Sequence, residues 1–187
     1  MEQNSLIIMA AVVGVVVVGS ILLLATRRQR TQRLAQLFGP EYDRTVEELG
    51  ERAKAEKELE ARAKRVQELH LHPLEPAQRD SFQQRWLTTQ ARFVDSPPAA
   101  VVQADELVAE VMRARGYPVA EFEQQAADLS VDHPRFVDNY RRAHALAGTA
   151  RHGQANTEDL RQAMVHYREL FEDLLEVAEP EPELQPA

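Results

Sequence analysis

Residues 5–25, SLIIMAAVVGVVVVGSILLLA, form an apolar run without a single charged side chain. At about 1.5 Å per residue a helix over this run is roughly 31 Å long, which matches the ~30 Å hydrocarbon core of a bilayer. We therefore predict one membrane-spanning helix over residues 5–25, preceded by a short extracytoplasmic N-terminus over residues 1–4.

A cleavable secretory signal explains the run less well. Such signals begin with basic residues and carry a shorter apolar stretch of about 7–15 residues, whereas residues 1–4 (MEQN) contain no Lys or Arg. A lipoprotein signal is excluded because its lipidated residue is a cysteine and the chain has no cysteine. We interpret the run as an uncleaved anchor.

A basic juxtamembrane segment over residues 26–38 follows the apolar run. Its arginines are Arg27, Arg28, Arg30 and Arg33, and no Lys or Arg precedes the run. Because loops rich in Lys and Arg stay in the cytoplasm, the N-terminus is expected outside and the rest of the chain in the cytoplasm. The four arginines are also candidates for contact with anionic lipid headgroups at the membrane surface; alternatively, they act only as a topology signal.

Small residues within the apolar run leave room for self-association. Ala10 and Gly14 lie four residues apart, a spacing that lets two membrane helices pack closely. A homo-oligomer through the anchor is therefore one alternative, although such residues are common in membrane helices.

The charge of the remaining chain excludes some partners. Residues 26–187 hold 22 basic and 29 acidic side chains, a net charge of −7, and residues 38–187 alone carry 18 against 29, or −11. Nucleic-acid binding needs concentrated positive charge, so we expect no nucleic-acid partner. The absence of cysteine also excludes disulfides, thiolate metal sites and cysteine nucleophiles.

Apolar residues recur at spacings of three and four, which predicts an all-α protein. We expect one soluble helical domain over residues 39–176, made of a long charged helix over 41–70 and a compact helical bundle over 76–176. The acidic tail over residues 177–187, rich in Pro and Glu, is expected to be disordered.

The predicted helix over residues 41–70 repeats its apolar residues with a period nearer 3.5 than 3.6, which is typical of a coiled coil. The seam is imperfect, because Glu56 stands where an apolar residue is expected and Gly50 lowers helix propensity by about 1 kcal/mol. Two alternatives follow: a self-associating stalk, or a helix that packs on its own domain.

Within the bundle, Phe82, Trp86 and Phe93 share one helix face, which we interpret as core rather than as a partner-binding surface. The last helix has the clearest apolar stripe, and either Asn156 or Thr157 is the candidate N-cap at its start. Asp132 is a candidate N-cap for the helix that follows it, which is the second-last helix of the chain. The stripe consists of Leu160, Met164, Tyr167, Phe171 and Leu174.

Candidate chemistry is sparse. The histidines that could bind a metal are His70, His72, His144 and His166, but no H-E-x-x-H or comparable pattern groups them. The chain has no G-x-S-x-G nucleophile motif and no phosphate-binding glycine loop. We therefore predict no catalytic residue, no cofactor and no enzymatic activity, with the four histidines as weak metal candidates.

The segment from FGPEYDR near residue 38 to TEDLRQAMVHYRELFEDLL near residue 176, including the turns RARGYP and LSVDHP, resembles a family of uncharacterised bacterial single-pass membrane proteins with a small helical domain. The resemblance implies a bacterial source and hence a plasma (inner) membrane location. It implies no activity, cofactor or binding residue.

Two functions are consistent with these features. The first is a membrane-tethered, non-catalytic interaction or scaffold module with the lipid bilayer and an unidentified protein as partners. The second is a helical domain that binds a small ligand or metal between its helices. The arrangement of the histidines distinguishes them, because a ligand site needs several polar groups that converge on one cavity.

Overall fold

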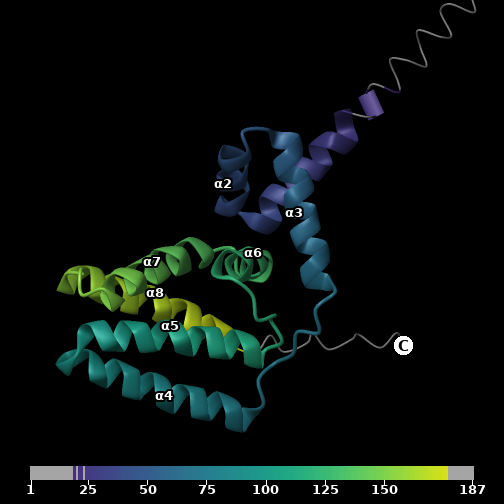
Figure 1. Cartoon of the computed structure of the whole chain (residues 1–187). Coiled ribbons are helices and arrows are strands. Elements are labelled where there is room, and N and C mark those ends of the chain that lie inside the picture. The colour runs from purple at the N-terminus through teal and green to yellow at the C-terminus, as the bar shows by residue number, and fades with distance from the viewer. Residues whose placement is uncertain (1–18, 20, 23, 177–187) are drawn as a thin grey trace, which may run out of the picture. The chain divides into compact units, whose positions relative to one another are not determined.

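The protein is all-helical over the part of the chain that its computed structural model describes, residues 19, 21–22 and 24–176 (Figure 1). No strand occurs among these residues, which confirms the predicted all-α class. A helix over residues 24–38 comes first. The following helices are α2 (Pro40–Leu49), α3 (Arg52–Gln67), α4 (Pro76–Asp95), α5 (Pro97–Ala114), α6 (Phe122–Asp132), α7 (Val137–Arg151) and α8 (Thr157–Leu175).

Most of the predicted membrane-spanning run over residues 5–25, and all of the tail over 177–187 predicted to be disordered, lie outside the described residues. Within the described residues, no helix combines the length and the apolar character that a membrane crossing requires.

The chain divides into two compact units, Met1–Glu60 and Ala61–Ala187, and residues 39–176, predicted as one soluble domain, belong to both of them. The basic segment over residues 26–38 belongs to the first unit rather than serving only as a link. Its Leu34 and Phe38 are buried, as are Ala55 and Leu59 of α3. The arginines are the most prominent feature of this segment in the sequence, but the apolar residues after Arg33 hold it in the unit.

The predicted uninterrupted helix over residues 41–70 is also wrong, because the chain breaks at Gly50. Gly50 has a left-handed backbone (φ 65°), and its N–H donates to the carbonyl of Val46, which ends α2. Glycine adopts this conformation without the steric cost that other residues incur. The coiled-coil seam is interrupted as well, since Tyr42 and Leu59 are buried while Leu49 is 43 % exposed.

Glu56, the residue that spoiled the predicted seam, joins three helices of the first unit. Its Oε1 accepts hydrogen bonds from the hydroxyl of Thr31 (2.6 Å) in helix 24–38 and from that of Tyr42 (3.1 Å) in α2. Burial, followed by the bond to Glu56, raises the pKa of Tyr42. The acidic side chain thus holds the unit together from a position where periodicity calls for an apolar residue.

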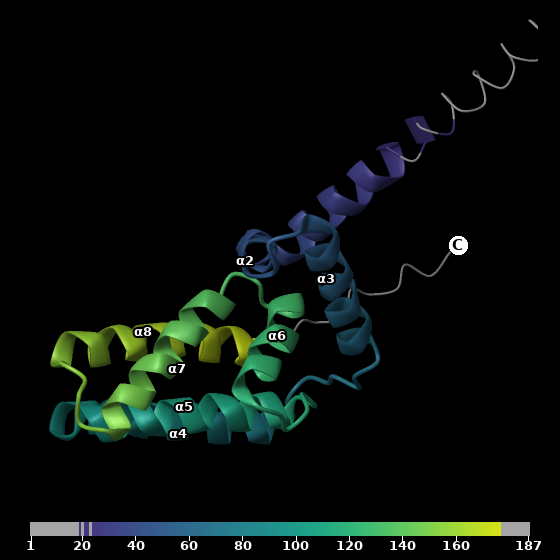
Figure 2. The same ribbon diagram turned by 45° about the horizontal axis from the view of Figure 1, so that its top comes forward.

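The second unit contains the predicted helical bundle, with α5 at its centre. Helix α5 packs against α4, α7 and α8, while α6 packs against α7 (Figure 2). The α8 stripe is buried as predicted, except that Met164 is only partly covered. The buried apolar residues of α5 are Ala100, Val101, Ala104, Leu107, Val108, Val111 and Met112.

One of the two predicted N-caps is confirmed. The side-chain oxygen of Asn156 accepts a hydrogen bond from the backbone N–H of Asp159 (2.9 Å) at the start of α8. Asp132 is not an N-cap, because α6 continues through it and α7 begins only at Val137. The Asp132 carboxylate instead accepts a hydrogen bond from the hydroxyl of Tyr117 (3.0 Å).

Candidate functional site

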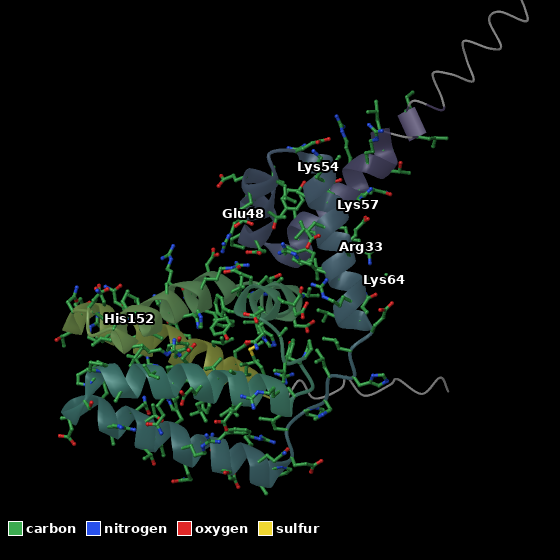
Figure 3. All side chains as sticks on the ribbon, viewed as in Figure 1. Arg33, Glu48, Lys54, Lys57, Lys64 and His152 are labelled. Carbon is green, nitrogen blue, oxygen red and sulfur yellow. The ribbon has the colours of Figure 1, made fainter. Side chains whose placement is uncertain are left out.

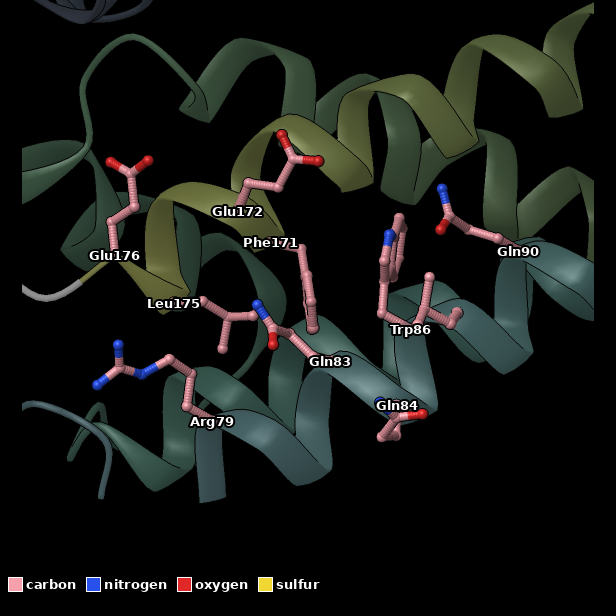
Figure 4. A pocket seen from close by; sticks show the side chains of 10 residues that line it. Arg79, Gln83, Gln84, Trp86, Gln90, Phe171, Glu172, Leu175 and Glu176 are labelled. Carbon is pink, nitrogen blue, oxygen red and sulfur yellow. The ribbon is translucent and has the colours of Figure 1, made fainter. Parts of the chain in front are cut away.

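A groove of about 880 Å³ runs between α4 and α8 (Figure 4). Both helices pack on α5, and the groove lies between them. It is lined by apolar side chains at its base and by amide and charged side chains along its edges. We refer to it as the α4/α8 groove, with the lining Arg79, Gln83, Gln84, Trp86, Leu87, Gln90, Phe171, Glu172, Leu175 and Glu176.

The floor of the α4/α8 groove is an aromatic stack. The rings of Trp86 and Phe171 lie with their centroids 4.8 Å apart and their planes inclined by 19°. Both residues are buried, as is Leu175 beside them, whereas Leu87 on α4 is 56 % exposed. The prediction that Trp86 belongs to the core is therefore confirmed, and the same indole also forms the floor of a surface groove.

The two edges of the groove carry opposite charges. Arg79 lies on the α4 side, and Glu172 and Glu176 lie on the α8 side (Figure 4). The Nε of Arg79 is buried and has no hydrogen-bond partner among the described residues. An unpaired buried donor costs free energy that a bound acceptor would recover. This lining suits binding; it contains no histidine, serine, threonine or cysteine for nucleophilic or metal chemistry.

A buried carboxylate, Asp105 of α5, organises a second polar site. It accepts a hydrogen bond from the Tyr167 hydroxyl (2.7 Å) and contacts Nδ1 of His144 (2.8 Å) and the guanidinium of Arg151 (2.6 Å). Burial alone would raise the pKa of Asp105, but the hydrogen bonds from His144, Tyr167 and Arg151 outweigh it and lower that pKa. As a carboxylate, Asp105 only accepts, so Nδ1 of His144 is the donor in their bond.

A cavity of about 450 Å³ adjoins this network. Its lining includes His144, whose ring stacks on Phe122 with centroids 3.7 Å apart and planes 7° from parallel. An imidazole held by a carboxylate can act as a general base. The cavity lining offers no hydroxyl or thiol nucleophile apart from the phenol of Tyr140, whose pKa is raised by burial.

The four candidate histidines do not form a metal site. His70 and His72 are exposed in the segment between α3 and α4, and Nδ1 of His166 is buried without a hydrogen-bond partner. Among the described residues, no three His, Asp or Glu side chains are placed to hold a metal ion together. Only His144 of the four lies beside a buried acid at a cavity.

The predicted membrane-surface arginines all lie on helix 24–38 and are exposed. Arg30 is engaged by acids of α3, with its Nε 2.6 Å from Glu60 and 3.7 Å from Glu56. Acids of α3 therefore balance part of the charge of Arg30, which distinguishes it from Arg27, Arg28 and Arg33.

Neither the α4/α8 groove nor the role of Asp105 was predicted from the sequence. The groove joins residues of α4 to residues of α8, and Asp105 lies 62 positions from Tyr167. One signal for the groove was Leu87, an apolar residue beside Trp86 that lies off the predicted aromatic face.

No protein-family model, curated protein or solved structure matches the chain. The resemblance to bacterial single-pass membrane proteins therefore stays a prediction.

Proposed function

We propose that this protein is a membrane-tethered, non-catalytic interaction module whose α4/α8 groove binds an amphipathic helix of a partner protein. The apolar run over residues 5–25 and the arginines behind it support the tether. The proposed location is the plasma (inner) membrane of a bacterium, with the N-terminus outside and the helical units in the cytoplasm. The observation that carries the proposal is the groove, with its buried aromatic floor and exposed Leu87.

The form of the groove favours a helical occupant. Its walls are helices of 20 and 19 residues, so a third helix can lie between them with its apolar face on Trp86, Phe171 and Leu175. Binding of an amphipathic helix in an apolar groove uses anchors spaced three or four residues apart. Large aromatic side chains at the base of a pocket are also the residue types that dominate binding energy at interfaces.

The charges on the groove edges favour one orientation of that helix. Arg79 on the α4 side attracts an acidic residue, and Glu172 and Glu176 on the α8 side attract basic ones. A partner helix with an apolar face flanked by acidic residues on one side and basic residues on the other fits this pattern.

The test compares two substitutions on the same helix. Leu87→Glu places a charge in the groove, while Val94→Glu, at a residue that is 84 % exposed and outside the groove lining, is the matched control. Affinity purification from membranes with the anchor intact should enrich a protein with wild type and Val94→Glu but not with Leu87→Glu. A synthetic peptide of the enriched protein's amphipathic helix should then bind purified wild type and Val94→Glu directly, and Leu87→Glu more weakly. Recovery of the same proteins by all three baits would refute the groove as the binding site.

Binding of a small ligand between helices is the second candidate, and the Asp105–His144 cavity supports it. Its metal-binding form has no support among the described residues. A ligand screen by thermal shift distinguishes the two functions. A compound whose stabilising effect is lost in His144→Gln and retained in Leu87→Glu would favour the ligand-binding function.

A further inference from the structure

The first unit contains a cavity of about 740 Å³ between helix 24–38 and α3. Four arginines line it: Arg27, Arg28 and Arg30 from helix 24–38, and Arg52 from the start of α3. Leu24 and Glu56 lie in the same lining. The turn at Gly50 brings Arg52 beside arginines that precede it by more than twenty positions.

The positive charge of this cavity is only partly neutralised within the described part of the protein. Arg30 pairs with Glu60 and lies 3.7 Å from Glu56, the one acid in the lining, whose Oε1 also accepts hydrogen bonds from Thr31 and Tyr42. No described residue forms an ion pair or hydrogen bond with the guanidinium groups of Arg27, Arg28 and Arg52. Like charges around one cavity repel one another, and a bound anion would relieve that repulsion.

We propose that this cavity binds the phosphate group of an anionic phospholipid. Guanidinium groups recognise phosphate oxygens through paired hydrogen bonds, and several around one cavity provide both charge and donors. The assignment rests on the proposed membrane tether.

The apolar residues beside the cavity select a lipid over free phosphate. Leu24 of helix 24–38 lines the cavity, and Leu24 and the preceding Ile21 and Leu22 are each about 60 % exposed. These side chains offer apolar surface to acyl chains next to the arginines. A soluble phosphate would gain nothing from that surface, whereas an amphiphilic lipid contacts both parts.

The cavity also distinguishes arginines that look equivalent in the sequence, because only some of them line it. Arg27 and Arg28 line it, Arg33 does not, and Arg52 joins from α3 although it lies outside the basic segment. Arg33, Lys54 and Lys57 are exposed cations of the same unit that lie outside the cavity lining (Figure 3). They provide a control that removes the same amount of charge.

The experiment uses the full chain in a nonionic detergent and isothermal titration calorimetry. The probes are short-chain phosphatidylglycerol below its micelle concentration, phosphatidylcholine of the same chain length, and inorganic phosphate. Phosphatidylglycerol should bind saturably and phosphatidylcholine should not. The triple variant Arg27→Gln, Arg28→Gln, Arg52→Gln should bind about 100-fold more weakly, whereas Arg33→Gln, Lys54→Gln, Lys57→Gln should remain within about twofold of wild type. Far-UV circular dichroism checks that both triple variants keep their helix content.

Two results would overturn the inference. Binding of inorganic phosphate as tight as that of phosphatidylglycerol would make this a free-phosphate site, and equal weakening in both triple variants would reduce the effect to overall charge. Membrane fractionation of cells separates this inference from the proposed function. A chain that stays in membranes but does not bind phosphatidylglycerol refutes the lipid site alone, while a soluble chain that binds the lipid refutes the tether alone.

Discussion

Trp86 of α4 and Phe171 of α8 stack with their ring centroids 4.8 Å apart. The two helices pack on α5, and this ring pair closes the base of the groove between them. The stack therefore has two roles, as part of the hydrophobic core and as the floor of the proposed binding site. Stability and binding must be separated by choosing residues that affect only one of them.

Replacing Trp86 by alanine should destabilise the protein by about 3–5 kcal/mol, because a large buried side chain leaves a cavity. Leu87→Glu, at the exposed neighbouring position, should change the free energy of unfolding by less than about 0.5 kcal/mol. Urea unfolding of the full chain followed by circular dichroism measures both. A Leu87→Glu variant as unstable as Trp86→Ala would show that Leu87 belongs to the core and cannot report on binding alone.

Asp105→Asn should lower the free energy of unfolding by about 2 kcal/mol at neutral pH, because the charged acceptor of three hydrogen bonds is lost. The pKa of Asp105 is lowered from its ordinary 3.8, so its stabilising effect is fully present above that value and is lost as the pH falls through the lower folded-state pKa. The stability difference between wild type and Asp105→Asn should therefore shrink as the pH falls below 3.8. Urea titrations at a series of acidic pH values measure it. A difference that stays constant down to the lowest pH would mean that the Asp105 carboxylate does not stabilise the fold through its charge.

Glu158 provides the control for that experiment. Hydrogen bonds from Arg161 and Gln162 lower its pKa to about 2, but the ion pair lies on the surface with the Glu158 side chain 57 % exposed. Solvent screens such a pair, so Glu158→Gln should leave the free energy of unfolding almost unchanged across the same pH range. A pH-dependent loss as large as that of Asp105→Asn would indicate that burial is not what makes the Asp105 network important.

Local patterns in the sequence predict the helices of the second unit well. The α8 stripe and the Asn156 cap depend on residues within a few positions of one another, where the 3.6-residue period acts directly. The same reasoning fails at Gly50, because a single glycine in a helical pattern fits two structures. It can lie inside a helix at a cost of about 1 kcal/mol, or it can end the helix in a left-handed conformation, where glycine is favoured. The burial of Tyr42 and Leu59 around Glu56 decides that the helix ends at Gly50, and no local sequence pattern shows this burial.

The candidate sites depend on contacts between residues that are distant in sequence. Asp105 meets His144 at a separation of 39 positions, and Trp86 meets Phe171 only because α4 and α8 share α5. His144 stands out in the sequence as a histidine that could bind a ligand. The pairing of His144 with Asp105 cannot be seen in the sequence, because every helix from α2 to α8 carries at least one Asp or Glu.

The topology makes a separate prediction. If Arg27, Arg28, Arg30 and Arg33 set the orientation, a cytoplasm-active reporter at the C-terminus should be active in wild type. Replacing the four arginines by glutamine and residues 2–4 by lysine should invert the chain, so that a reporter active only outside the cytoplasm becomes active instead. Membrane fractions should contain both versions. A wild-type chain whose C-terminus is active only outside would contradict the predicted orientation.

The last prediction concerns two glycines that should respond oppositely to alanine. Gly116, just after α5, has φ 98°, and a Cβ there would lie 2.6 Å from the backbone oxygen of His70. Gly116→Ala should therefore destabilise the protein by about 2 kcal/mol or more, since neither the left-handed backbone nor the close backbone contact tolerates a side chain. Gly148 lies inside α7, and a Cβ added there would meet nothing within 4 Å, so Gly148→Ala should stabilise the protein by about 0.5–1 kcal/mol. Urea unfolding of the two variants beside wild type measures both changes, and a neutral Gly116→Ala would mean that the segment carrying His70 can move away from the end of α5.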